Sequence, residues 1–86
     1  MEDRIILAKK AYSDNPADKY LEIHLAVIKH PGSEFKPIEF VTWCYNKHSK
    51  SHFCGHYFEG TQEGFERAVK DFNNSGVQTG TMLTII

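Results

Sequence analysis

Apolar and polar side chains alternate most regularly over residues 20–29. One set of alternate positions holds Leu21, Ile23, Leu25 and Val27, and the other holds Glu22, His24, Ala26 and Ile28. Alternation with a period of two, together with several β-branched residues, predicts a half-buried strand. Residues 30–33 include a proline and a glycine, so we expect the strand to end there.

The middle of the chain predicts a β-hairpin. One strand is expected after Pro37, over residues 38–45, and another over residues 52–58. Residues 46–51 between them are polar and show no apolar periodicity. We therefore predict that these two strands pair and that the hairpin has a long, basic tip.

A helix is predicted over residues 61–74. Spacing of i, i+3, i+4 and i+7 defines one apolar face, made by Phe65, Ala68, Val69 and Phe72. Thr61 is expected to cap the N-terminus, and Gly76 can adopt the left-handed conformation that ends a helix. Gly64, inside the first turn, costs up to about 1 kcal/mol relative to alanine.

The first fifteen residues fit two patterns. As a strand they place Ile5, Leu7 and Ala11 on one side and turn at residues 14–16 into the next strand. As a helix they would complete the helix-strand-strand-strand-helix order of a double-stranded-RNA-binding domain. We prefer the strand, because strands adjacent in sequence usually neighbour one another in the sheet.

The end of the chain is unlike an ordinary tail. Residues 73–86 include no charged side chain, whereas disordered tails are usually polar and charged. Threonine, isoleucine and methionine without proline favour a strand over residues 82–86. This strand would close the edge of its own sheet, which we prefer, or cross to a second subunit and form a homodimer.

Length and composition support one domain spanning residues 1–86. No apolar run is long enough to cross a bilayer and no secretory signal is visible, so we expect a cytoplasmic protein without a membrane partner. A net charge of −1 gives no general attraction for nucleic acid. The predicted fold is α+β: an antiparallel sheet of three to five hairpin-connected strands, with the helix packed across one face.

The pairing register of the hairpin determines which side chains share a face. If Cys44 stands opposite Cys54, then Trp43 stands opposite Gly55. One face then carries Val41, Trp43, Tyr45, Phe53 and Tyr57. The other carries Phe40, Thr42, Cys44, His52, Cys54, His56 and Phe58. We expect the aromatic face to pack on the helix and Trp43 to be part of the core.

The second face gathers thiols and imidazoles, which are the preferred ligands of zinc. The candidate ligands are Cys44, His52, Cys54 and His56. Their spacing matches no zinc motif, so we expect no metal and no cofactor, and we expect the two thiols to be free rather than bonded in a reducing cytosol. A cysteine nucleophile would need a base and an orienting group, and the sequence offers no obvious third residue. We therefore predict that the protein is not an enzyme.

The hairpin tip is the predicted partner-binding site. Its candidate contact residues are Lys47, His48 and Lys50. Residues 40–58 contain no acidic side chain, and exposed loops on rigid scaffolds often carry binding function. A protein partner is our first expectation, and a nucleic acid contacted by the basic tip is the alternative.

A discontinuous motif runs through residues 40–72. It reads Phe-Val-Thr-Trp at 40–43, Tyr-Asn at 45–46, Gly-His-Tyr-Phe at 55–58, Ala-Val at 68–69 and Asp-Phe at 71–72. The motif resembles that of small uncharacterised proteins from bacteria and their phages, although the tip lacks the glycine expected there. The resemblance implies the fold and a bacterial or phage setting. By analogy, the protein is expected to bind a protein of the host machinery or a defence system.

Overall fold

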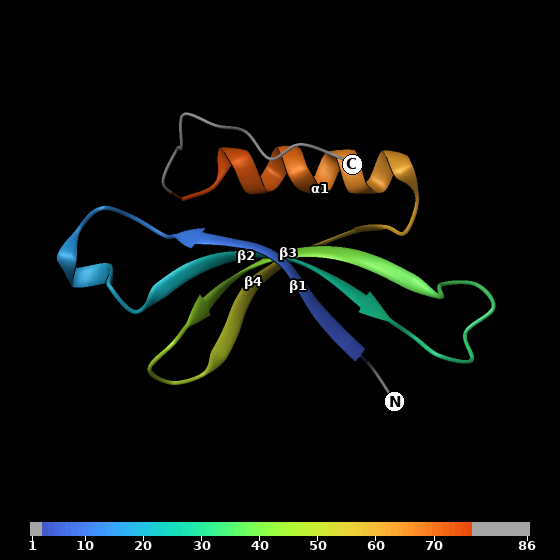
Figure 1. Ribbon diagram of the computed structural model, residues 1–86, viewed down its shortest axis with the longest axis horizontal. Helices are drawn as coiled ribbons and strands as arrows, with labels where there is room; N and C mark the ends of the chain where they lie inside the picture. Colours follow the sequence, from blue (N-terminus) through green and yellow to red (C-terminus); the bar gives the residue numbers. More distant parts are fainter. Residues whose placement is uncertain (1–2, 77–86) are drawn as a thin grey trace.

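The protein is an antiparallel sheet with one helix packed on it (Figure 1). The computed structural model describes residues 3–76 of the 86-residue chain. The elements are the strand β1 (Asp3–Ala11), a 3-10 turn η1 (Pro16–Asp18), the strands β2 (Leu21–Lys29), β3 (Ile38–Asn46) and β4 (Ser51–Glu59), and the helix α1 (Gln62–Asn74). The four strands form a meander in the order β1-β2-β3-β4. The predicted α+β class is confirmed.

The first residues form a strand, as preferred from the sequence. β1 pairs antiparallel with β2, and Asn15 caps the connecting turn by accepting a hydrogen bond from the Ala17 amide at 2.9 Å. The described chain therefore runs through four strands and then one helix. The helical alternative, with the element order of a double-stranded-RNA-binding domain, is wrong.

The helix begins and ends where its capping residues predict. Thr61 Oγ1 accepts a hydrogen bond from the Gly64 amide at 3.0 Å, and Gly76 has a φ of +63° after the last turn. Gly64 is required by close packing, because a Cβ there would lie 1.8 Å from the carbonyl oxygen of Glu59. No helix within residues 3–76 is long and apolar enough to cross a membrane.

The helix packs on the face of the sheet opposite to the one predicted. Its core consists of Ile23, Leu25, Ala68, Val69 and Phe72, with Phe40, Cys44, Phe58 and Phe65 packed around it. The expectation that the face carrying Trp43 and Tyr57 covers the helix is therefore wrong. Both faces of β3 carry apolar side chains, so the periodicity alone does not show which face packs on the helix.

A β-bulge explains the errors in the predicted hairpin register. From Glu39 to Thr42 the pairing is as predicted, with Thr42 opposite His56. Beyond the bulge Cys44 stands opposite Phe53, not Cys54. The extra residue on β4 shifts the remaining pairs by one position and exchanges the faces of the side chains beyond it. His52 consequently lies on the Trp43 side of the sheet.

A second core lies on the face without the helix. It consists of Ala26, Ile28, Val41 and Trp43, with Tyr45 packed against it. Trp43 is only 5% exposed, so its predicted burial is confirmed although its neighbours differ from those expected. The guanidinium of Arg4 lies 5.6 Å from the centroid of its ring, and the His52 ring centroid lies 4.4 Å away. The strand expected at residues 82–86 lies outside the described residues.

Candidate functional site

The predicted partner-binding residues lie in a compact turn at the end of the β3–β4 hairpin. The Lys47 amide donates to the Tyr20 carbonyl at 2.7 Å, and the Lys47 ammonium lies 3.8 Å from Glu22 Oε2. The His48 ring lies 5.3 Å from the ring of Tyr20. Lys50 adopts a left-handed φ of 57°. Lys47 and His48 therefore contact residues at or just before the start of β2.

The candidate zinc ligands are not brought together as a set. His52 lies on the Trp43 face, where its ring packs 4.9 Å from that of Tyr45. Cys44, Cys54 and His56 lie toward the end of the helix on the other side. Among residues 3–76, no group of three or more His, Cys, Asp or Glu side chains is placed to hold a metal ion. The bulge separates His52 from the others.

The structure supplies His56 with a carboxylate partner that the sequence did not reveal. Asp71, on α1, lies with Oδ2 3.3 Å from His56 Nδ1 and also accepts a hydrogen bond from the Thr42 hydroxyl. Burial raises the pKa of the Cys44 thiol, and the neighbouring Cys54 raises it further. A thiol held protonated is a weak nucleophile. This arrangement does not favour Cys44 as the attacking group of a hydrolytic site.

A hydrogen-bonded chain of side chains crosses the second core. The Trp43 indole N–H donates to His24 Nδ1 at 3.2 Å, so the proton of the neutral His24 ring lies on Nε2. Nε2 in turn donates to Glu22 Oε1 at 3.0 Å. Partial burial alone would raise the pKa of Glu22, but the hydrogen bond from His24 and the charge of Lys47 lower it overall. These hydrogen bonds satisfy polar groups that are largely buried, so the chain stabilises the fold.

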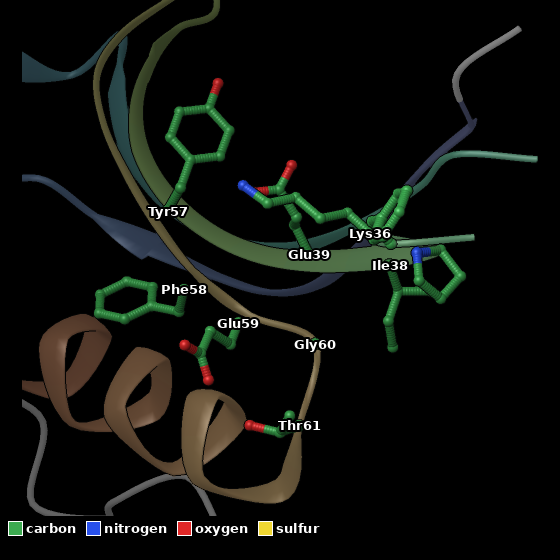
Figure 2. A pocket seen from close by; sticks show the side chains of 10 residues that line it. Lys36, Ile38, Glu39, Tyr57, Phe58, Glu59, Gly60 and Thr61 are labelled. Atoms are coloured by element: carbon green, nitrogen blue, oxygen red, sulfur yellow. The ribbon is translucent and has the colours of Figure 1, made fainter. Parts of the chain in front are cut away.

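A cavity of about 560 Å³ lies at the other end of β4 from the tip (Figure 2). The loop before β3, the first residues of β3, the last residues of β4 and the helix cap all contribute to it. We call it the Phe35–Tyr57 groove, and its main lining residues are Phe35, Ile38, Glu39, Tyr57, Glu59 and Thr61. The groove lies where the chain turns from β4 into α1. Gly60 packs tightly against Ile38 at this turn.

Two exposed aromatic rings line this groove. Phe35 is 96% exposed and Tyr57 is 60% exposed, although both are large apolar side chains. Glu39 and Glu59 are directly paired across the two strands, and Glu39 Oε1 lies 2.9 Å from His30 Nε2. Figure 2 shows the Lys36 side chain reaching toward the Glu39 carboxylate. The groove therefore combines two exposed aromatic rings with two carboxylates and one ammonium group.

This groove has little signal in the amino-acid sequence. Phe35 lies in a loop, where hydrophobic periodicity has no meaning, and the lining residues come from two stretches that are distant in the sequence, 35–39 and 57–61. The only sequence signal was an aromatic residue between two charged ones, Glu34 and Lys36. Comparison with known protein families, curated proteins and solved structures found no match. The resemblance to small bacterial and phage proteins remains a prediction from the sequence.

Proposed function

We propose that this protein binds an extended segment of another protein and holds one of its apolar side chains in the Phe35–Tyr57 groove. The exposure of Phe35 and Tyr57 at one cavity is the observation that carries this proposal. Exposed aromatic side chains beside a cavity are typical anchors of protein interfaces, because their burial by a partner releases much apolar surface from water.

The free edge of β4 supplies the second half of the binding site. Within residues 3–76, β4 is the last strand of the sheet and pairs only with β3. Its outer edge therefore presents backbone amides and carbonyls that an extended segment can pair with. The bulge at Cys54 interrupts the regular edge, so pairing is expected over residues 55–59, next to the groove.

Charge complementarity indicates the chemistry of the segment. Glu39 and Glu59 contribute two carboxylates to the groove, against the single ammonium of Lys36. A lysine or arginine next to the apolar anchor would be attracted to these carboxylates. We therefore expect an anchor of aliphatic or aromatic character flanked by a basic residue. The setting suggested by the sequence resemblance is a bacterial or phage one, with a host protein as the partner.

A displayed library of random peptides tests this function without a known partner. The full chain should enrich peptides with an apolar anchor beside lysine or arginine. A Phe35→Ser/Tyr57→Ser variant should bind the enriched peptides at least about tenfold more weakly, which corresponds to about 1.4 kcal/mol. Phe53→Ser is the matched control, because Phe53 is also exposed on β4 but lies beyond the bulge. All variants should keep the melting temperature of the parent chain.

Two results would contradict the proposal. One is the absence of enriched peptides, and the other is equal binding by the groove variant and the Phe53→Ser control. A Lys47→Glu/Lys50→Glu variant separates the groove from the hairpin tip. If this variant alone loses binding, the contact lies at the tip predicted from the sequence.

A further inference from the structure

Both cysteines of the protein line one cavity, which is separate from the Phe35–Tyr57 groove. This cavity, of about 230 Å³, lies between the sheet and the end of α1. Cys44 is half-buried on β3, and Cys54 is exposed on β4. His56 and Asp71 line the same cavity, whereas the Trp43 ring lies on the opposite face of the sheet. None of these side chains takes part in the function proposed for the groove.

The bulge in β4 leaves Cys54 beside the cavity that Cys44 also lines. Cys44 is paired with Phe53, so Cys54 is one residue further along β4. Consecutive side chains of a regular strand point to opposite faces of the sheet, and Cys54 would then point away from Cys44. Instead Cys54 has a φ of 55°, a left-handed conformation that is unusual for a residue other than glycine. Backbone strain of this kind clusters at functional sites.

We propose that Cys54 and Cys44 form a thiol–disulfide exchange pair that reacts with small disulfides such as oxidised glutathione. The Cys54 thiolate attacks one sulfur of the disulfide, which breaks the S–S bond, forms a mixed disulfide and releases one glutathione thiolate. Cys44 then loses its proton to solvent and attacks Cys54 Sγ. This second step forms the Cys44–Cys54 disulfide and releases the other glutathione, so two electrons pass from the protein to the reagent.

The environments of the two thiols assign these roles. Cys54 is accessible to a reagent in solution, whereas Cys44 is half-buried. Burial and the neighbouring Cys54 both raise the pKa of the Cys44 thiol. Formation of the mixed disulfide removes the charge of Cys54, so that this charge no longer raises the pKa of Cys44. Cys44 is thus better suited to the second, intramolecular step than to the first.

Intact-mass measurement of the full chain with oxidised glutathione tests the pair. The parent protein should lose two hydrogens and keep no glutathione, because Cys44 resolves the mixed disulfide. Cys44→Ser should keep one glutathione on Cys54, and Cys54→Ser should react at least about tenfold more slowly. The fluorescence of Trp43, the only tryptophan, should change on oxidation and recover with dithiothreitol.

Three outcomes would overturn the pair. The first is a stable glutathione adduct on the parent protein, which would show that Cys44 does not reach Cys54 Sγ. Formation of a disulfide-linked dimer in place of the internal bond is the second. The third is a parent chain whose thiols react no faster than those of Cys54→Ser. Circular dichroism of both serine variants confirms that the fold is retained.

Discussion

Trp43 lies in the second core, on the face of the sheet that the helix does not cover. The alternation along β3 predicted that its ring is buried, and the ring is buried. The helix was expected to cover it, yet α1 lies on the other face of the sheet. The side chains of Arg4 and His52 contact the ring instead. Residue burial follows from pattern, whereas the identity of the covering group depends on the tertiary arrangement.

Replacing Trp43 with alanine should lower the free energy of unfolding by about 3–5 kcal/mol. The substitution empties the centre of the second core and removes the hydrogen bond to His24 Nδ1. Trp43→Phe keeps most of the ring volume and should cost clearly less. Urea unfolding followed by circular dichroism measures both variants. An unchanged midpoint for Trp43→Ala would show that the second core contributes little to stability.

His52 should make the protein less stable in mild acid. Partial burial lowers the pKa of His52 below its ordinary value of 6.5, and the positive charge of Arg4 lowers it further. As the pH falls below 6.5, the unfolded chain therefore takes up a proton before the folded chain does. Stability should fall over this range and level off below the folded-state pKa of His52.

Urea midpoints measured between neutral pH and mild acid test this behaviour. His52→Phe should flatten the dependence just below pH 6.5, since no proton is then bound at this position. Glu22 provides an internal comparison, because its pKa is lowered from 4.5 and its stabilising effect is lost only at more acidic pH. A parent chain and a His52→Phe variant with the same slope would contradict the assignment to His52.

At the level of elements, the sequence predicted where the strands and the helix lie but not how two of the strands are aligned. Alternation and capping residues are local signals, and they located β2, the hairpin strands and α1 closely. A bulge is a single inserted residue with no periodic signature, so the register beyond Thr42 was wrong. Because of this bulge, the four candidate zinc ligands do not share one face of the sheet, and His52 lies on the Trp43 face.

Gly64 offers a test of close packing between α1 and β4. Helix propensity alone would make Gly64→Ala stabilising by up to about 1 kcal/mol. The added Cβ would meet the Glu59 carbonyl oxygen at 1.8 Å, so the helix must shift. We expect a net loss of about 1–3 kcal/mol instead. Glu66→Ala, on the exposed face of the same helix, is the matched control for thermal unfolding. A more stable Gly64→Ala variant would show that α1 moves away from β4 at little cost.

At the scale of the whole molecule, the two edges of the sheet differ in character. The β4 edge adjoins the Phe35–Tyr57 groove, whereas the β1 edge carries three exposed aliphatic residues in succession, Ile5, Ile6 and Leu7. The α+β class followed from the order of local patterns. The groove did not, because it forms only when the loop before β3, the end of β4 and the cap of α1 meet. Sites assembled from several segments have no contiguous sequence signature.

The strand predicted from the sequence at residues 82–86 is expected to pair with the β1 edge. Those residues lie outside the described range, but the described chain ends at Gly76, where an added Cβ would lie 3.0 Å from the Ala11 carbonyl oxygen. Gly76 thus lies beside the end of β1. A chain lacking residues 81–86 should unfold at lower temperature and precipitate more readily, since Ile5 and Leu7 would keep an unpaired apolar edge. Light scattering distinguishes pairing within one chain, which predicts a monomeric parent, from exchange between two chains. A truncated chain with the stability and mass of a parent monomer would show that these residues do not support the sheet.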